Sequence, residues 1–268
     1  MSESTPTIKR LSRFPIKGMT AEPLTSVTLS AGEGIPGDRL YGFARYNSGF
    51  NPENPQPLPK QRFVVLANEA KLAGLTSHFN QDSLQLDIIV NEQTHHFDMT
   101  TPDGCKRAEL FLHTTLSLSD KEPPVFVSSS PHRFTDVSVD SVEMMNAISV
   151  LNLASVRELE KMIDAEIDPA RFRANIEIDG LPPFAELEAV GTTLSFDGVE
   201  MKIVARTQRC AATEVNPASA ERDVKIPYLI NQNLGHADMG VYASVMSGGE
   251  LSVGQSGIHI IQTNNERG

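Results

Sequence analysis

Short strand-like segments recur along almost the whole chain, and this recurrence limits the possible folds more than any other feature. The turn-forming pairs Asp197-Gly198 and Gly248-Gly249 stand between such segments and predict hairpins. Many short strands at this spacing indicate a barrel or sandwich with a few attached helices. The expected fold class is therefore mainly β (α+β). Strands are predicted at 7–17, 23–30, 38–46, 62–67, 84–90, 107–118, 147–151, 172–178, 193–196, 201–205, 208–215, 241–246 and 250–253.

Residues 152–164 form the strongest helix candidate in the sequence. Their apolar side chains recur at helical spacing and therefore share one face. Asn152 is expected to cap the N-terminus of this helix. The residues on the apolar face are Leu153, Val156, Leu159 and Ile163.

The length of 268 residues, 40% of them hydrophobic, allows one large domain or two small ones. An irregular stretch at 121–131 is the predicted boundary, which divides the chain into a β domain at 1–120 and a second domain at 121–268. The segment 50–60 is rich in Pro and Asn and predicts an exposed loop. A surface excursion is the favoured reading of this loop, and a lid over a site is the alternative.

The formal net charge of −11 excludes a global positive field for nucleic acid. Any anionic ligand must then be held by a local cluster of Arg and Lys. No apolar stretch approaches the roughly 20 residues that span a bilayer, so no membrane association is expected. The first ten residues lack the apolar segment of a signal peptide, and a cytoplasmic location is therefore expected.

Cys210 is the first candidate for chemistry, and it lies in the strand-like run ARTQRCAATEVNP. Arg206 and Arg209 precede it, and nearby positive charge favours the thiolate, which is the form that attacks or binds metal. An inert buried cysteine remains the alternative. The other cysteine, Cys105, follows a Pro-Asp-Gly turn and is expected to be a loop thiol without a role. With two cysteines and no CxxC, a zinc or iron–sulfur site held by this chain alone is not expected.

A set of cationic and polar residues in turn-flanked contexts is the second candidate. Arg suits phosphate because its planar guanidinium makes bidentate contacts, and the first turn of the 152–164 helix offers a hydroxyl to an anion. Surface salt bridges are the alternative for each residue taken singly. The members are Lys17, Arg39, Ser155, Arg173 and Asn175.

Histidines give a weaker signal. His95 and His96 are neighbours in a strand-like segment and therefore point to opposite faces, so they do not share a metal easily. His236 and Asp238 have a spacing that places both on one side of an extended loop, although a structural role is favoured. The sequence has no GxSxG, HExxH or Walker motif.

Several stretches, taken in order, resemble the MOSC family, which is named for the C-terminal domain of molybdenum cofactor sulfurase. The first two belong to the N-terminal β domain that often precedes MOSC, and the set is similar to bacterial relatives of the mitochondrial amidoxime-reducing component. The stretches are FPIKG at 14–18, GDR at 37–39, ISVLNLASVRELE at 148–160, RFRANIEIDGLPPF at 171–184, RC at 209–210 and MGVYASVMSGGELSVG at 239–254.

The resemblance implies a MOSC-type β-barrel with a few helices plus an N-terminal β subdomain, and it implies the molybdenum cofactor (molybdopterin). Cys210 matches the cysteine that is a molybdenum ligand in the reductase branch, which makes it the expected catalytic residue. The positions expected to contact the pterin and phosphate are Lys17, Arg39, Ser155, Arg173 and Asn175.

The resemblance also implies two functions. The first is a molybdenum-dependent oxidoreductase that reduces small N-hydroxylated compounds. It would need a separate ferredoxin- or flavin-type electron donor, because the chain lacks the cysteines of a ferredoxin domain. The second is a non-catalytic carrier of the molybdenum cofactor or of sulfur as a persulfide. Pyridoxal phosphate binding is only a family association, since no lysine lies in a context that argues for a Schiff base.

The sequence departs from the family near the expected site. Gly254-Gln255 stands where a Gly-Asp is common, and the chain has no Trp after the PPF stretch. The segment EVNPASAERD replaces a Thr-Gly-containing turn. These departures leave the expected fold unchanged but weaken any assignment of substrate.

Overall fold

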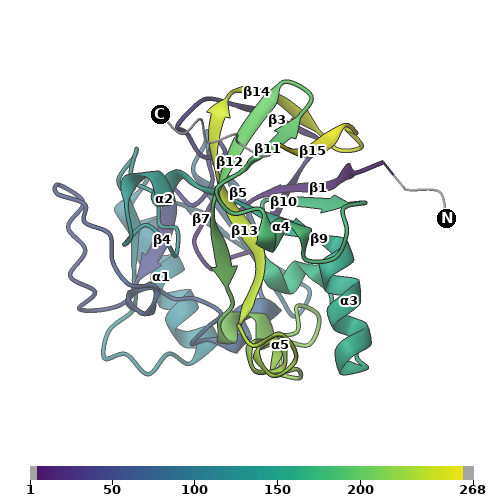
Figure 1. Cartoon of the computed structure of the whole chain (residues 1–268). Coiled ribbons are helices and arrows are strands. Elements are labelled where there is room, and N and C mark those ends of the chain that lie inside the picture. Colours follow the sequence, from purple (N-terminus) through teal and green to yellow (C-terminus); the bar gives the residue numbers. More distant parts are fainter. Residues whose placement is uncertain (1–4, 262–268) are drawn as a thin grey trace.

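An eight-stranded sheet organises the computed structural model, which describes residues 5–261 (Figure 1). The strand order is β15-β11-β12-β13-β9-β10-β1-β2. The strands are β1 (Thr7–Arg13), β2 (Glu22–Leu24), β3 (Ser26–Leu29), β4 (Tyr41–Ala44), β5 (Thr76–Asn80), β6 (Gln85–Val90), β7 (Gln93–Asp98), β8 (Val125–Ser128), β9 (Ile148–Asn152), β10 (Ile176–Asp179), β11 (Thr193–Phe196), β12 (Val199–Gln208), β13 (Asp238–Ser247), β14 (Gly249–Ser252) and β15 (Ile258–Ile261).

Helices flank the sheets rather than forming a layer of their own (Figure 1). No helix within residues 5–261 is long and apolar enough to cross a membrane. The α-helices are α1 (Pro102–Leu116), α2 (Val142–Asn146), α3 (Leu153–Ile163), α4 (Ala185–Glu188) and α5 (Ile226–Leu234). Short 3-10 helices occur at Lys60–Arg62, Ala70–Gly74, Pro169–Phe172 and Ala211–Glu214.

The large sheet curls so that its two ends approach each other. β9 and β10 are parallel, and the other neighbouring strands are antiparallel. Thr7 at the start of β1 forms a bridge with Ser256, two residues before β15, and the backbone of Ile8 bonds to Gly254 and Gln255. One apolar cluster fills the interior of this curled sheet, with fully buried side chains such as Val150, Ile176, Ile203 and Val241. The mainly β (α+β) class is confirmed.

Two further clusters lie outside the large sheet. The three-stranded sheet β5-β6-β7 packs with α1 around a core that includes Leu86, Ile88 and Leu112. On another side, α3 and α5 bury Leu159 and Ile230 against the end of β9. The helix predicted at 152–164 is confirmed as α3. The side chain of Asn152 caps it by accepting a hydrogen bond of 3.1 Å from the Ala154 N–H.

The strand predicted at 107–118 is wrong, because this segment belongs to helix α1. Its buried residues Gly104, Ala108, Leu112 and Leu116 recur every four positions, which is helical spacing. The Thr101 side chain caps the helix at the Gly104 N–H, and Pro102 occupies the first turn. This Thr-Pro start signal marks the helix in the sequence and was missed.

Three other local predictions are also wrong. Residues 62–67 form no strand, although Ala44 and Phe63 make an isolated bridge. The run 208–215 is not one strand, because β12 ends at Gln208 and a 3-10 turn follows. The pair at 248–249 does not close a hairpin, since β14 pairs with β3 rather than with β13.

Strand pairing crosses the predicted domain boundary in both directions. β1, from the first 120 residues, pairs with β10, while β8, from the second part, pairs with β4. The stretch 121–131 was expected to be irregular and instead contains β8. The division into 1–120 and 121–268 stays a prediction.

We expect Leu159→Ala to lower the free energy of unfolding by about 3 kcal/mol, because it leaves a cavity between α3 and α5. Leu159 is fully buried, whereas Met162 on the same helix is 39% exposed. Met162→Ala, the matched control, should change stability by less than about 1 kcal/mol. Urea denaturation measures both variants, and equal losses would contradict the assigned packing.

Candidate functional site

The predicted site residues come from segments that end at the same edge of the large sheet. Ser12 near the end of β1 bonds through its N–H to the carbonyl of Asn175, just before β10, and the Asn175 N–H bonds to the carbonyl of Ser149 in β9. Ser149 pairs with Tyr242 in β13, and β13 pairs with β12. The strand register therefore brings loops that are far apart in the sequence to one place.

A cavity of about 370 Å³ lies at this edge, and we call it the Cys210 cavity. Lys17, Arg39, Arg173, Asn175 and Cys210 all line it. The structure thus brings together five of the predicted residues from four separate segments. Other lining residues are Lys60, Asp136, Thr207, Arg209 and Tyr242.

Cys210 lies just beyond the end of β12 and not in the middle of a strand. It precedes the 3-10 turn Ala211–Glu214, and its carbonyl accepts hydrogen bonds from the Thr213 N–H and hydroxyl. Two bonds to one carbonyl fix the backbone at this residue. The side chain is partly exposed to the cavity, so the thiol is accessible to a bound group.

Two lysines and one carboxylate form a charged group beside Cys210. The Lys17 ammonium, only 4% exposed, donates to Asp136 and to the Phe134 carbonyl at 2.8 Å. Lys60 lies 3.6 Å from Asp136 and interacts electrostatically with the Cys210 sulfur. Burial lowers the pKa of Lys17 more than Asp136 raises it. Burial alone would raise the pKa of Asp136, but Lys17 and Lys60 reverse this effect and lower it.

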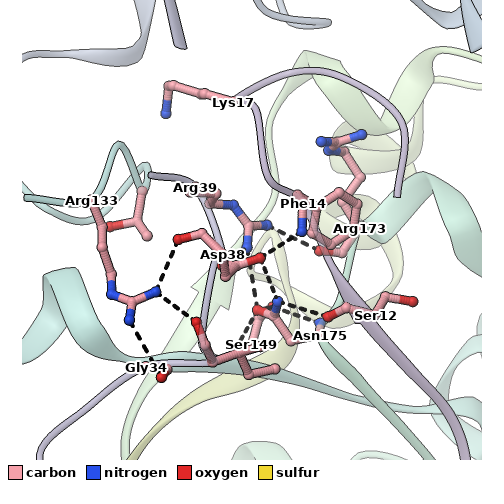
Figure 2. A network of polar contacts seen from close by, with 12 residues as sticks. Ser12, Phe14, Lys17, Gly34, Asp38, Arg39, Arg133, Ser149, Arg173 and Asn175 are labelled. Carbon is pink, nitrogen blue, oxygen red and sulfur yellow. Dashed lines mark hydrogen bonds and ion pairs between the residues drawn. The ribbon is translucent and has the colours of Figure 1, made fainter. Parts of the chain in front are cut away.

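Asp38 and Asn175 form the centre of a buried hydrogen-bond network (Figure 2). Asp38 Oδ1 accepts from the Phe14 N–H at 2.7 Å and from Asn175 Nδ2 at 3.1 Å, and Asp38 Oδ2 accepts from Arg39 at 2.5 Å. Asn175 Oδ1 accepts from the Ser149 hydroxyl at 2.8 Å. Because protein partners occupy both ends of its amide, Asn175 positions the neighbouring residues. The predicted direct contact between Asn175 and a ligand would need a free amide donor or acceptor, and the side chain of Asn175 has none.

Arg39 is held by the same network. Burial alone would lower the pKa of Arg39, but the adjacent Asp38 carboxylate outweighs burial and raises it. Arg133 braces the loop before Arg39 by donating to the carbonyls of Ile35 at 2.7 Å and Asp38 at 2.9 Å (Figure 2). The guanidinium of Arg39 therefore faces the cavity from a rigid support.

Arg173 differs from the other cations because its guanidinium has no hydrogen bond or ion pair within residues 5–261. It stacks on the Phe14 ring with 4.3 Å between the guanidinium carbon and the ring centroid. Burial, together with the nearby Arg39 charge, lowers the pKa of Arg173 to about 9. In Figure 2 the guanidinium points away from the Asp38 network. An unpaired, desolvated Arg of this kind is suited to bind an anion.

Three buried polar atoms of residues that line the Cys210 cavity also lack partners among the described residues. They are Arg171 Nε, Arg209 Nη2 and Thr207 Oγ1. The remaining donors of Arg209 bond to the carbonyls of Met239 at 2.7 Å and Phe172 at 2.9 Å. Gly240 is needed here, since a Cβ on it would lie 3.1 Å from Arg209 Nη2 and 2.5 Å from the Val150 carbonyl oxygen. Unpaired buried polar atoms are rare and require an explanation, and a bound ligand, ion or water is one.

Comparison with protein families provides the assignment. The model of the MOSC domain matches residues 124–256, which include Arg173, Arg209 and Cys210. Residues 124–256, just under half of the chain, are therefore assigned to a MOSC domain.

Proteins named molybdenum cofactor sulfurase share sequence with part of this chain. Those of Caenorhabditis briggsae and Caenorhabditis elegans are each 37% identical over 76 residues, and that of Drosophila willistoni is 32% identical over 116 residues. The aligned parts cover 28%, 28% and 43% of this chain but only 10%, 10% and 14% of the sulfurases. The chain therefore matches a small portion of each curated relative.

Two solved structures show weak similarity. The YuaD protein of Bacillus subtilis aligns over 94% of this chain and 93% of its own, with a TM-score of 0.42 and 14% identity. YiiM from Geobacillus stearothermophilus aligns over 43% of this chain and 54% of its own, with a TM-score of 0.33 and 17% identity. At these scores neither similarity adds to the assignment.

Ser155 lies outside the Cys210 cavity, although it is in the first turn of α3 as expected. Its hydroxyl donates to the Glu186 carboxylate at 2.8 Å and accepts from the Phe184 N–H at 2.8 Å. Asn152 donates to the same carboxylate at 3.1 Å. Ser155 is fully buried, and its hydroxyl is satisfied by protein partners, so it is not part of the site.

The remaining sequence candidates are also outside the cavity. Cys105 is in helix α1 rather than in a loop, where its thiol donates to the Met99 carbonyl at 3.4 Å. Burial raises the pKa of Cys105. His236 accepts from the Asp238 N–H at 3.1 Å with Nδ1, which closes a turn before β13.

Sequence reasoning missed Lys60, Asp136 and Tyr242 as members of the site. Lys60 ends the Pro-rich segment 50–60, so the end of this loop reaches the site although most of it is exposed. Tyr242 had a detectable signal, because it alternates with the core residues Val241 and Ala243 and must face the other side of β13.

The buried carboxyl group of Glu186 should make the stability of the protein depend on pH. Its burial raises the pKa of its carboxyl group, against the opposing effect of hydrogen bonds from Ser155 and Asn152. A raised carboxyl pKa contributes stability at low pH that is lost as the pH rises through the folded-state value. We expect Glu186→Gln to gain stability relative to the native protein as the pH rises from about 4.5 to 7.5.

The measurement is urea unfolding across this pH range, with Glu188→Gln as the control. Glu188 belongs to the same helix, and its side chain is 79% exposed. A constant difference in stability between Glu186→Gln and the native protein at all pH values would contradict the prediction.

Proposed function

We propose that this MOSC domain binds the molybdenum cofactor in the Cys210 cavity and reduces small N-hydroxylated compounds there. The observation that carries the proposal is the combination of an accessible thiol and an unpaired arginine in one cavity, Cys210 and Arg173. A soft thiolate suits molybdenum, and a guanidinium suits the phosphate of the pterin. The relatives named molybdenum cofactor sulfurase support the same cofactor.

The residues of the cavity fit this group. Arg209 Nη2 and the Thr207 hydroxyl are buried without partners, and both offer hydrogen bonds to a polar ligand. The partly exposed guanidinium of Arg173, which has no hydrogen bond within residues 5–261, offers further donors. The cavity volume of about 370 Å³ lies within the usual range for sites of small ligands and cofactors. Ligand hydrogen bonds would remove the cost of leaving these buried groups unsatisfied.

Each part of the cavity would have a separate task. Cys210 would supply sulfur to the metal, and Arg173 would bind the phosphate. Arg39 and Lys17 would add positive potential, although both are already paired with carboxylates. Tyr242 would contribute a protonated hydroxyl, because burial raises its pKa against the opposing effect of Arg209.

The reaction needs electrons and protons from outside the chain. Conversion of an R–NH–OH group to R–NH2 breaks the N–O bond, consumes two electrons and two protons, and releases water. When bound, the cofactor would supply the electron-transfer chemistry of this reaction. A separate ferredoxin- or flavin-type protein is the proposed electron donor. The chain's own residues hold the cofactor and orient the substrate.

A non-catalytic carrier of the cofactor or of sulfur is the second candidate. The matching relatives are named for sulfur transfer to the cofactor rather than for reduction, which is compatible with a role in handling the cofactor or its sulfur. The same cavity would then hold the cofactor for delivery, or Cys210 would carry a persulfide. Reduction of N-phenylhydroxylamine with an added electron donor distinguishes the two functions, because a carrier gives no turnover.

We expect Cys210→Ser to lose most of its molybdenum, because a hard oxygen replaces the soft sulfur ligand. The protein is purified from a host that makes the cofactor, and elemental analysis gives molybdenum per chain. The native protein and the control Cys105→Ser should both contain close to one molybdenum per chain. A folded native protein without molybdenum would contradict stable cofactor binding.

Arg173→Gln is expected to stabilise the cofactor-free protein while lowering its molybdenum content. In the empty cavity the Arg173 charge is desolvated and lies near Arg39, which the lowered pKa reflects. Loss of the stacking on Phe14 offsets this gain by about 0.5–1 kcal/mol. Thermal unfolding and elemental analysis measure the two effects.

Arg157→Gln is the matched control, because Arg157 is exposed and paired with Asp179. This variant should change stability little and leave the molybdenum content unaltered. Lower stability of Arg173→Gln together with an unaltered molybdenum content would count against the proposed phosphate contact.

A further inference from the structure

A second cavity of about 250 Å³ adjoins the Cys210 cavity. It lies between the end of β1, the 3-10 turn Ala70–Gly74 and the segment 212–217. We call it the Met19 cavity. Nothing in the proposed function so far uses this space.

The walls of the Met19 cavity are mainly apolar. Phe14, Met19, Leu72, Leu75 and Val215 line it, and each is at most 6% exposed. These are aromatic, thioether and branched aliphatic side chains, which favour an apolar ligand.

Two of the three arginines that line this cavity are paired with carboxylates, Arg10 with Glu177 and Arg171 with Asp223. Arg171 Nε is buried and has no partner among the described residues. Paired groups offer little to recognise a polar ligand such as a nucleobase. Arg173 is the exception, but it faces both cavities and is the proposed phosphate ligand.

The two cavities share part of their walls. Gly18, Leu66, Arg171, Arg173 and Ala212 line both. Ala212 follows Cys210 by two residues, so the two Cα atoms are no more than about 7 Å apart. One edge of the shared wall therefore lies near the thiol, where the chemistry is proposed.

Building on the proposed function, we infer that the Met19 cavity holds the apolar body of the substrate while its N–OH group extends into the Cys210 cavity. An apolar cavity of about 150 Å³ can bind benzene. A volume of about 250 Å³ thus accommodates one ring with a short substituent. The substrate class is then an uncharged N-hydroxylated amine that carries a single aromatic ring or a compact alkyl group.

Methionine NMR tests the site without the cofactor. Met19 lines the Met19 cavity, and Met144 lines the Cys210 cavity, so the two methyl signals report on the two spaces separately. The probe is aniline, the product of N-phenylhydroxylamine reduction, added to protein labelled with 13C at the methionine methyl groups. Met19→Leu and Met144→Leu assign the signals.

We expect a saturable shift of the Met19 signal, with a Kd on the order of 1 mM, and a much smaller shift at Met144. A shift at Met144 alone, or no saturable shift at either methyl, would overturn the inference. Ala73→Phe fills the Met19 cavity and should abolish the shift at Met19. Ala31→Phe places the same side chain on an exposed turn and is the control.

Kinetics then separate this inference from the proposed function. Ala73→Phe should lower kcat/KM for N-phenylhydroxylamine relative to hydroxylamine by about tenfold or more. An unchanged ratio in a folded, active variant would refute the assignment of the cavity. If the Met19 signal shifts but the loaded native protein with its electron donor reduces neither compound, the reductase function fails. The cavity's preference for an apolar ring would then still stand.

Discussion

The buried Asp38 carboxylate is the interaction on which the arrangement of the cavity depends. It joins the backbone after β1, the guanidinium of Arg39 and the amide of Asn175 in one set of hydrogen bonds. A carboxylate removed from water is costly unless every oxygen finds a donor, and here both oxygens do. The same contacts fix the loop before β4 against the start of β10. The hydrogen bonds that satisfy the Asp38 carboxylate therefore help to fix the positions of the cationic residues in the cavity.

Charge in the cavity is distributed unevenly, although the whole chain carries a net charge of −11. Asp136 pairs with both Lys17 and Lys60, and Asp38 pairs with Arg39. Arg173 alone among these cations keeps no counter-ion within the described residues. Burial lowers its pKa only to about 9, so the guanidinium stays charged at neutral pH, and it stacks on the ring of Phe14. The cavity thus contains cations that are paired within the protein and one unpaired cation, Arg173. An anionic ligand of the cavity would bind at this unpaired cation.

Much of the fold was predictable, and the failures have physical causes. Alternation and helical periodicity report burial, so the hairpin of β11 and β12 and the amphipathic helix α3 could be recognised. Helix α1 was mistaken for a strand because its start signal, Thr101-Pro102, was not weighed. Cys210 and the predicted cations meet in one cavity, but Ser155 does not, because its hydroxyl serves Glu186. Lys60 and Asp136 could not be found, since their proximity depends on the long-range path of two loops.

The pairing of β1 with β10 makes the folding unit larger than the segment that the MOSC model matches. Residues 124–256 include β10 but neither β1 nor β2, which cover one side of it in the sheet. Without them, β10 would present an unpaired row of backbone donors and acceptors, a template for association with other chains. The N-terminal segment thus protects an edge as well as supplying Lys17 and Arg39. If the MOSC segment were transferred to another protein, β1 would have to be transferred with it.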